Sequence, residues 1–445
     1  MSMKSIYRKL SPFQIITVSF SLLIFLGAVL LSLPLSTEGH APVSFLDALF
    51  TSCSAVCVTG LVVKNTATFW SPFGKVVILS LIQIGGLGVV TSMIAISIFT
   101  GKRIGLRDRN LMQNAVNAPK IGGIIRFTRF LLLFTLAAEI LGTVLLAIPF
   151  VRDFGLRSGL AKAVFHSISA FCNAGFDLFG DKIPFLSLVG YRGDIAVNAV
   201  IMGLIVAGGL GFMTWEDLLD NHFRWKKLRV QTRLVLVVSA VLILVPAVLF
   251  AFLEFHGEGI KTRVVLSLFQ SVTTRTAGFN TANLRDMSES SRLVMIVLMM
   301  IGGSSGSTAG GMKTVTVGVM LLSTLSVARG KTRLTVFRRT ISPAQISMAV
   351  SIVTLMVSLS LAGAVVITGI NGIPFVDALF ETTSALGTVG LTADVTPGLN
   401  AASQLMIIVF MFFGRVGITT ISMGFLMGDR AEERIQFAET KLMIG

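Results

Sequence analysis

Phe375-Val-Asp-Ala-Leu-Phe380, followed by Thr388-Val-Gly-Leu391, is the stretch of sequence that decides the fold. It consists of a short apolar segment and a loop, and a longer hydrophobic run flanks it on each side. A Thr-Val-Gly step after a short helix is typical of backbone carbonyls arranged to replace the water around a monovalent cation. Four residues alone establish little, so the question is whether the chain repeats them.

The same pattern occurs four times. Phe45-Leu-Asp-Ala-Leu-Phe50 matches the hexapeptide above at five of six positions, and each hexapeptide ends ten residues before a glycine. In the second unit Phe165 precedes the glycine by ten residues. In the third unit Phe269 precedes the glycine by nine, so the third loop is either one residue tighter or shifted in register. The four loops read Val58-Thr-Gly-Leu, Asn173-Ala-Gly-Phe, Thr276-Ala-Gly-Phe and Thr388-Val-Gly-Leu. Such internal repetition predicts the architecture of the whole chain.

Composition places these units in a membrane. The 445-residue chain is 53% hydrophobic and only 13% charged, and its mean hydropathy is +0.84. A soluble protein of this length has no means of hiding so much apolar surface. Uncharged runs such as 10–37 and 340–376 are long enough to cross the roughly 30 Å hydrocarbon core of a lipid bilayer. The first run lacks a clear cleavage site, so we interpret it as a retained helix rather than a signal peptide.

Each unit is predicted to contain a long helix, a short pore helix and a second long helix. The predicted segments are 11–33, 44–56 and 73–99; 127–150, 161–172 and 195–215; 230–253, 264–274 and 293–327; and 341–370, 375–386 and 401–426. The expected fold is therefore an all-α polytopic membrane protein with eight transmembrane helices and four pore helices. The predicted units are 1–100, 101–215, 216–330 and 331–428, followed by a cytoplasmic C-terminal tail over 429–445.

Charge predicts the orientation of the chain. If the pore helices enter the membrane from outside without crossing it, the remaining links and both termini carry a strong excess of Lys and Arg over Asp and Glu. The positive-inside rule then places the N- and C-termini in the cytoplasm and the protein in the cell membrane. The formal net charge of +15 reflects this topology. No nucleic-acid partner is expected, because the basic residues are spread over several separate segments.

The number of crossings predicts a central pore. Each unit crosses twice, so all four units share one orientation, and parallel repeats favour a pseudo-fourfold arrangement around an axis along the membrane normal. Inverted repeats, which many secondary transporters use, require units with an odd number of crossings.

The four loops supply the chemistry that a cation pore needs. Main-chain carbonyls stabilise a dehydrated cation without a full negative charge, and glycine allows the positive φ that aims successive carbonyls along a pore. The pore helices point the negative ends of their dipoles at the same centre. Glycines also allow membrane helices to pack closely, but four at matched positions after short helices favour a filter. The predicted filter residues are Val58, Thr59, Gly60, Asn173, Ala174, Gly175, Thr276, Ala277, Gly278, Thr388, Val389 and Gly390.

These four units, the single glycine in each loop and a glycine-rich stretch in the third unit resemble the Trk/Ktr/HKT superfamily of potassium transporters, most closely the membrane subunits of Ktr systems. The resemblance covers essentially the whole chain. It implies K⁺ uptake through the filter carbonyls, frequently with Na⁺ involvement, and no covalently bound cofactor. It also implies a homodimer on a cytosolic octameric ring of nucleotide-binding, KtrA-type (RCK) subunits. Glycine in the first loop, here Gly60, goes with potassium preference in this family, whereas serine there is associated with sodium transport in plant relatives.

A second glycine signature recurs in the later helix of each unit: Gly85-Gly-Leu-Gly88, Gly208-Gly-Leu-Gly211, Gly302-Gly303 and Gly414-Arg-Val-Gly417. In the third unit it opens a run with almost no helix-forming content, and the resemblance assigns this run the role of an intracellular gate. Free backbone groups at membrane depth are tolerated only where protein or a water-filled cavity receives them. The predicted gate residues are Gly302, Gly303, Ser304, Ser305, Gly306, Ser307, Thr308, Ala309, Gly310 and Gly311, together with Lys313 and Arg415. A phosphate-binding loop is disfavoured, because Met312 separates the last glycine from the lysine.

Arg415 is the only charged residue between Asp394 and Asp429. An arginine at the centre of the membrane costs roughly 2.5–3.5 kcal/mol on insertion scales, so it normally has a partner or a purpose. One interpretation is a barrier to K⁺ below the filter with a contact to the gate loop, and the other is a structural anchor. Lys313 either belongs to the gate or reaches the cytoplasmic interface.

The other polar residues at membrane depth are predicted to be structural. Glu139 and His166 are interpreted as hydrogen-bonding groups within the helix packing. Asp47 and Asp377 are expected to stabilise the amino ends of their pore helices and, more weakly, to attract cations from outside. The three cysteines lie in apolar segments without a CxxC pair and are interpreted as small buried apolar residues.

The sequence thus predicts gated, electrochemically downhill permeation of K⁺. An alternating-access, sodium-coupled secondary transporter is the alternative, and the broken helix of the third unit is its main support. A scaffold or sensor that transports nothing leaves the matched loops unexplained. An enzyme is not expected, because no cluster of His, Cys and carboxylates has a catalytic spacing. The tail over 429–445 is assigned to a dimer or ring contact by its position alone.

Overall fold

The computed structural model describes residues 11–99, 105, 111–113, 123–180, 185, 187–331, 333–417 and 420. In chain order its helices are α2 (Pro12–Leu31), α3 (Phe45–Val56), α4 (Pro72–Leu87) and α5 (Val89–Phe99) in the first unit; α7 (Ile124–Phe154), α8 (Leu156–Phe171), α9 (Ile195–Gly209) and α10 (Phe212–Asp220) in the second; α11 (Val230–Leu253), α12 (Ile260–Thr273), α13 (Glu289–Met300) and α14 (Thr314–Ala328) in the third; and α15 (Pro343–Asn371), α16 (Phe375–Gly387) and α17 (Ala401–Val416) in the fourth. The predicted tail over 429–445 lies outside the described residues.

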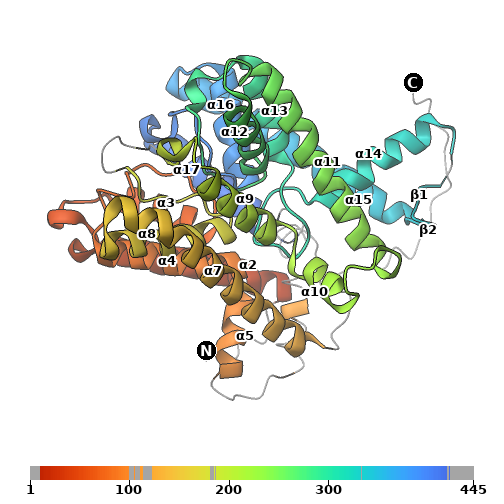
Figure 1. Ribbon diagram of the computed structural model, residues 1–445, viewed down its shortest axis with the longest axis horizontal. Coiled ribbons are helices and arrows are strands. Elements are labelled where there is room, and N and C mark those ends of the chain that lie inside the picture. Colours follow the sequence, from red (N-terminus) through yellow and green to blue (C-terminus); the bar gives the residue numbers. More distant parts are fainter. Residues whose placement is uncertain are drawn as a thin grey trace.

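A short antiparallel hairpin, β1 (Thr335–Val336) and β2 (Arg339–Thr340), joins the third unit to the fourth. The hairpin and the adjoining ends of α14 and α15 extend to one side of the molecule (Figure 1). Short 3₁₀ turns occupy several of the connections: Pro34–Ser36, Glu38–His40, Val189–Tyr191, Trp225–Lys227, Leu284–Asp286 and Thr396–Gly398.

The first long helices of units one and four begin with the same local signal. Ser11 caps α2 and Ser342 caps α15, and in each case a glutamine three residues later completes a capping box. A proline follows each capping serine, where its missing N–H costs nothing because the first helical N–H groups have no partner within the helix. Sequence therefore sets where both helices start.

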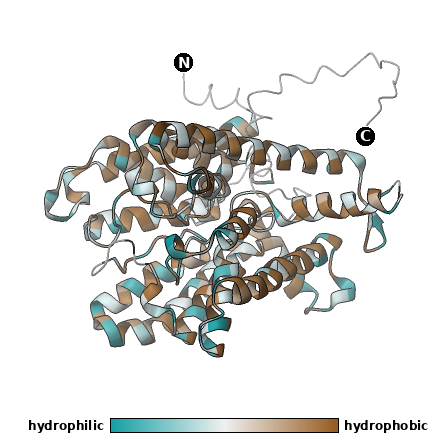
Figure 2. Ribbon diagram, turned by 90° about the horizontal axis from the view of Figure 1, so that it is seen from above, coloured by the Kyte–Doolittle hydropathy of each residue, from teal (hydrophilic) through white to brown (hydrophobic). Residues whose placement is uncertain are grey.

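The first helix of every unit is long and apolar enough to cross a membrane, namely α2, α7, α11 and α15. The bent pairs α4–α5 and α9–α10 also qualify when each pair is taken as one crossing. Hydrophobic residues run along the bodies of the helices, whereas hydrophilic residues concentrate at turns such as the β1–β2 hairpin (Figure 2). Many large apolar side chains on the long helices are exposed, which fits a surface that faces lipid rather than water.

The units are arranged in a closed cycle. In the first, second and fourth units the pore helix packs against the long helix before it and the helix after it, and in the third α12 packs against α11. Between units, the later helix of one packs against the pore helix of the next: α4 on α8, α9 on α12, α13 on α16, and α17 back on α3. Because the fourth unit returns to the first, the pseudo-fourfold arrangement predicted from the parallel repeats is confirmed.

Two of the later helices are not continuous, which corrects the unbroken spans predicted over 73–99 and 195–215. In the fourth unit α17 ends at Val416, and most of the predicted span beyond it lies outside the described residues. α4 and α5 meet at a bend of 96°, and α9 and α10 meet at a bend of 92°. The breaks fall at the last glycine of the second glycine signature, with φ of 86°, 88° and 91° at Gly88, Gly211 and Gly417. An α-helix requires a negative φ, so this signature ends a helix instead of merely allowing close packing.

Candidate functional site

The four loops meet in one ring. Each filter glycine faces the backbone carbonyl that precedes the filter glycine of the next unit. The approaches, in order, are Gly60 to the Ala174 oxygen, Gly175 to the Ala277 oxygen, Gly278 to the Val389 oxygen and Gly390 to the Thr59 oxygen. A Cβ atom added at any of the four would lie less than 3.0 Å from that oxygen, and a backbone neighbour has little freedom to move away. Any other residue at these positions requires the neighbouring backbone to shift.

All four loops share one backbone conformation. The residue two positions before each glycine is left-handed, with φ of 57° at Val58, 59° at Asn173, 64° at Thr276 and 50° at Thr388. The glycines have φ of 92°, 69°, 79° and 92° in unit order, as the need for positive φ predicted. Left-handed backbone at a β-branched residue costs of order 1–3 kcal/mol and persists only where its surroundings fix it. The ring is therefore a conformation imposed on all four sequences by their packing.

The third loop is one residue tighter than the others, which decides between the two alternatives left by its spacing. In every loop the residue before the glycine donates its N–H to a carbonyl near the end of the pore helix. The bonds are Thr59 to Ser54 (2.8 Å), Ala174 to Ser169 (2.7 Å), Val389 to Ser384 (2.8 Å) and Ala277 to Thr273 (3.0 Å). The first three bonds span five residues and the last spans four. The residue missing from the third loop therefore lies between its pore helix and its filter residues, and the filter residues keep the same position in the ring as those of the other units.

A row of buried hydroxyls ties each pore helix to the long helix of its own unit; we call it the anchoring row. The bonds are Ser52 to the Ile24 oxygen (2.7 Å), Ser167 to Glu139 (2.7 Å), Ser271 to Ile243 (2.6 Å) and Thr382 to Ser360 (3.1 Å). In the third unit Pro246 has no N–H for the Leu242 carbonyl four residues earlier, and Ser271 lies 3.3 Å from that oxygen as well. The row holds the pore helices at one depth.

The second glycine signature lets the later helices approach the ends of the pore helices. Gly85, Gly208 and Gly414 lie against the carbonyls of Val56, Phe171 and Leu386, which stand four residues before the filter glycines of their units. A Cβ atom at any of the three would collide with that oxygen. The third unit differs, because its Gly302 lies against Gly310 and against Thr276 of the filter.

The predicted gate loop, residues 302–311, lies against the ring and against the break in α9. Ser304 and Thr308 donate their N–H groups to the carbonyls of Gly209 (2.9 Å) and Gly208 (3.3 Å). The Thr308 hydroxyl donates to the Phe171 oxygen at 3.1 Å, at the end of the second pore helix. Gly310 lies against Thr388 of the fourth filter loop. Protein groups thus receive backbone groups that the absence of helix would leave free at membrane depth.

Arg415 bridges three units. Its guanidinium donates to the carbonyls of Thr308 in the gate loop and of Gly85 and Gly86 at the end of α4, the last at 2.9 Å. The contact between Arg415 and the gate loop that the sequence suggested is therefore present. Lys313 donates to the Ala309 carbonyl at 2.8 Å, so it folds back onto the same loop.

A cavity of about 350 Å³ adjoins the gate loop. Its lining includes Ser305 and Ser307 of the loop, Lys313 and Arg415, and the break glycine Gly88. Other residues of the loop contact the filter, so the loop separates the cavity from the ring. Non-helical backbone at membrane depth is tolerated where it lines a water-filled cavity, and the gate loop lines this one.

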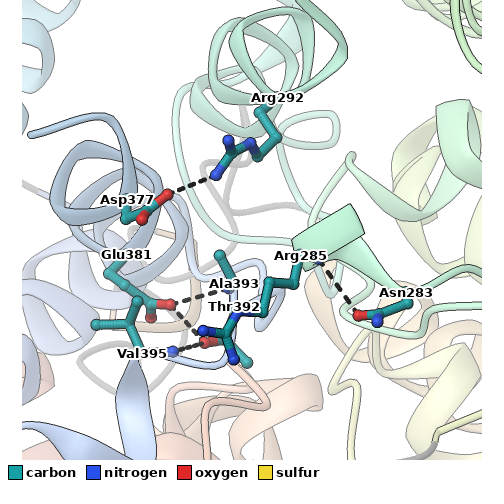
Figure 3. Close-up of polar contacts among 8 residues, drawn as sticks. All are labelled: Asn283, Arg285, Arg292, Asp377, Glu381, Thr392, Ala393 and Val395. Atoms are coloured by element: carbon teal, nitrogen blue, oxygen red, sulfur yellow. Dashed lines mark hydrogen bonds and ion pairs between the residues drawn. The ribbon is translucent and has the colours of Figure 1, made fainter. Parts of the chain in front are cut away.

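The two acidic residues at the amino ends of pore helices are both neutralised. Asp47 lies 3.5 Å from the Lys64 ammonium, and Asp377 accepts a hydrogen bond of 2.6 Å from Arg292 (Figure 3). Equivalent positions thus obtain their cation from different places: Asp47 from the loop of its own unit and Asp377 from α13 of the preceding unit. A paired carboxylate attracts external cations only weakly, so the outer role expected for both residues is not favoured.

The remaining residues predicted to be structural are packed into the interior. His166 is fully buried, stacks on Phe179 at 4.3 Å between ring centroids, and accepts the Leu178 N–H at 3.3 Å. The backbone carbonyl of Glu139 accepts the hydrogen bond from the Ser167 hydroxyl of the anchoring row. All three cysteines are buried and free.

Glu381 is a buried functional residue that the sequence did not predict. It directly follows the last Phe of the fourth pore-helix motif, the position that His166 occupies in the second. Its carboxylate accepts hydrogen bonds from the Ala393 N–H at 3.1 Å and from the Thr392 hydroxyl (Figure 3). It also accepts a hydrogen bond from the Thr396 hydroxyl at 2.6 Å. Like His166, it therefore holds the peptide three residues beyond a filter glycine. The signal available in the sequence was the position in the repeat, since both residues follow the same Phe.

The chain resembles known proteins along nearly its whole length. Residues 6–432 match the TrkH family model, described as cation transport protein. The potassium/sodium uptake protein NtpJ of Enterococcus hirae is 38% identical over 99% of both chains. Ktr system potassium uptake protein B of Bacillus subtilis is 40% identical over 96% of this chain and 95% of its own. A crystal structure of the potassium transporter TrkH from Vibrio parahaemolyticus has the same fold, with a TM-score of 0.72 at 20% identity over 94% of this chain and 84% of that one.

Proposed function

The chain belongs to the TrkH family of cation transport proteins, and from that premise we propose that it takes up K⁺ across the cell membrane through the ring of four loops. The observation that carries this proposal is the cyclic approach of each filter glycine to the carbonyl of the next unit. Such a ring gathers four backbone oxygens around one axis without a full negative charge. Oxygens held in this way replace the hydration shell of a monovalent cation.

In this proposal K⁺ is the transported ion and the filter residues hold it by their carbonyls. The innermost oxygens belong to Thr59, Ala174, Ala277 and Val389, because these face the glycines around the ring. Transport is downhill, driven by the electrochemical gradient, with no enzymatic step. Na⁺ involvement is supported by one relative whose name specifies potassium and sodium uptake.

The gate loop and Arg415 control this pathway. The loop lies between the ring and the cavity, and it is held by hydrogen bonds to α9, to the second pore helix and to Arg415. Opening requires these bonds to break together. Several relatives are named as parts of Ktr systems, which supports a partner subunit. We place a homodimer on a cytosolic, KtrA-type nucleotide-binding ring, with both termini and the cavity on the cytoplasmic side.

Flux through the purified protein tests the proposal. Full-length protein in liposomes with an outward K⁺ gradient is expected to accumulate ⁸⁶Rb⁺, and external K⁺ should compete better than Na⁺. Gly60→Ser should weaken that preference, because a side chain at this position meets the Ala174 oxygen. Deleting 302–311 should raise flux in the absence of a partner.

Two results would contradict this function. Absence of Rb⁺ uptake with and without a ring partner rejects transport. Uptake that Na⁺ inhibits as strongly as K⁺ rejects the potassium assignment. The alternating-access alternative predicts that uptake depends strictly on a Na⁺ gradient. A closed ring of carbonyls has no role in that mechanism.

A further inference from the structure

A second row of hydroxyls stands behind the filter. Its members are Ser54, Ser169, Thr273 and Ser384, each fully buried and each two residues after a member of the anchoring row. We call it the buttress row. The anchoring hydroxyls all make the same bond, to a carbonyl of the long helix. The buttress hydroxyls divide into two pairs that make opposite bonds to the filter.

In units one and four the buttress hydroxyl is an acceptor. The Gly60 N–H donates to Ser54 Oγ at 3.0 Å, and the Gly390 N–H donates to Ser384 Oγ at 3.1 Å. The carbonyl and N–H of a trans peptide point in opposite directions. An N–H directed back at the pore helix therefore directs the carbonyl of the preceding residue, Thr59 or Val389, toward the ring.

In units two and three the buttress hydroxyl is a donor. Ser169 donates to the Phe176 carbonyl at 2.8 Å, and Thr273 donates to the Phe279 carbonyl. Each Phe directly follows a filter glycine, so the bond turns that oxygen toward the pore helix and away from the ring axis. Within the described residues, neither Ser54 nor Ser384 holds the carbonyl of the leucine that follows its own glycine.

The division follows both the sequence and the geometry of the ring. Glycine is followed by Leu in units one and four and by Phe in units two and three. Units four and one are neighbours around the ring, and so are units two and three. The two kinds of bond thus occupy opposite halves of the filter.

We propose that the buttress row selects which backbone oxygens the filter offers to the ion, an inference that rests on the proposed function. At the level of the glycine all four carbonyls face the ring, and Ser54 and Ser384 hold those of Thr59 and Val389 in place. One residue beyond, Ser169 and Thr273 withdraw the oxygens of the opposite half, which leaves those of Leu61 and Leu391 as ligands. The buttress hydroxyls are positioning residues, because they contact the backbone of the filter and not the ion.

Removing one buttress hydroxyl tests this role in full-length protein in liposomes. In Ser169→Ala and Thr273→Val the Phe carbonyl is released from its hydrogen bond. The measured quantity is the Na⁺ concentration that halves ⁸⁶Rb⁺ uptake divided by the K⁺ concentration that does so. This ratio should fall about two- to tenfold, the change expected for one neutral hydrogen bond. In Ser54→Ala the glycine peptide is released, and the Rb⁺ concentration for half-maximal uptake should rise by a similar factor. Ser169→Thr and Thr273→Ser keep the hydroxyl and should retain wild-type values.

The anchoring row supplies matched controls. Ser52→Ala and Ser167→Ala remove a buried hydroxyl from the same helices, two residues away, but the lost bond runs to the long helix. They should change the ion ratios by less than about twofold, even where they lower the yield of folded protein. Equal changes in both rows, or unchanged ratios in the buttress variants, would overturn the proposal.

A second measurement separates failure of the inference from failure of the proposed function. Thermal unfolding of the purified protein in KCl, NaCl and choline chloride reports ion binding without flux. A K⁺-specific rise in Tm that Ser169→Ala reduces and Ser167→Ala preserves supports the buttress role even if no uptake occurs. The same rise in both variants, or no K⁺-specific rise in wild type, rejects it.

Discussion

The filter ring and the region beneath it are built from the same four units, but the units are alike in the ring and differ beneath it. In the ring every unit contributes a left-handed residue, a glycine and a carbonyl in the same order. Beneath it the units are not all alike: the first two bend sharply, the third inserts the gate loop, and the fourth supplies Arg415. The four units are alike where an ion would contact the backbone, and they differ where access to the pathway would be controlled. Substitutions in the repeated ring and in the unique elements beneath it are therefore expected to change flux in opposite directions.

The largest effect is expected in the ring. In Gly390→Ala the new Cβ meets the Thr59 oxygen and the backbone keeps a φ of 92°. Overpacking and left-handed strain together cost about 3–5 kcal/mol, so Rb⁺ uptake should fall by more than about 100-fold. Gly39→Ala is the control, because Gly39 also has positive φ but nothing lies within 4 Å of its added Cβ. A ring variant with wild-type uptake would show that the close approach is not required.

The unique arginine should act in the opposite direction. Arg415→Gln removes a charged donor from three carbonyls, and hydrogen bonds to charged groups are worth about 1.5–3 kcal/mol. Flux without any partner subunit should therefore rise about tenfold or more, as measured by Rb⁺ uptake into liposomes. Arg192→Gln, which breaks an exposed ion pair with Glu258, is the matched control. Unchanged flux in Arg415→Gln favours the anchor interpretation over a gate.

The same contrast explains what the sequence predicted and what it did not. The ring was predictable because its requirements repeat: units one and four share a motif such as Phe45-Leu-Asp-Ala-Leu-Phe50, and every unit has a Phe nine or ten residues before a glycine. The bends were not predicted, because a Gly-Gly-Leu-Gly run in an apolar segment is compatible with helix packing as well as with a break. The φ of Gly88 decides between these, and it depends on the packing of Gly85 against Val56.

The hydrogen-bonding residues behind the filter were missed for a different reason. Serine and threonine are common in membrane helices, so a single Ser carries no signal about its partner. Comparing the four pore helices position by position reveals the hydroxyls at alternate residues, Ser52 and Ser54 in the first unit for example. Even this comparison leaves open which hydroxyl donates and which accepts, since that depends on the loop conformation.

A moderate effect is expected within the gate loop. Thr308→Val removes the hydroxyl bond to the Phe171 carbonyl and leaves the loop backbone intact. A neutral hydrogen bond contributes about 0.5–1.5 kcal/mol, so partner-free flux should rise about two- to tenfold, less than for Arg415→Gln. Thr324→Val is the control, because the Thr324 hydroxyl is exposed and bonds only to its own helix, at Met320. A loss of flux in Thr308→Val would mean that this bond holds the pathway open.

The smallest effect is expected at the outer ends of the pore helices, where units one and four again use equivalent aspartates. Arg292 and Asp377 are half-sheltered and 2.6 Å apart, whereas Lys64 is more exposed and 3.5 Å from Asp47. Exposed pairs contribute about 0–1 kcal/mol, so Arg292→Gln should lower Tm by about 1–3 °C and Lys64→Gln by less than about 1 °C. Arg292→Gln also leaves the Asp377 carboxylate unpaired at the amino end of its pore helix, which should raise Rb⁺ uptake slightly at low ionic strength and less at high, because salt screens charges near the surface. If both variants behave alike, the equivalence of units one and four extends from the ring to these charges; if they differ as expected, that equivalence is confined to the backbone of the filter.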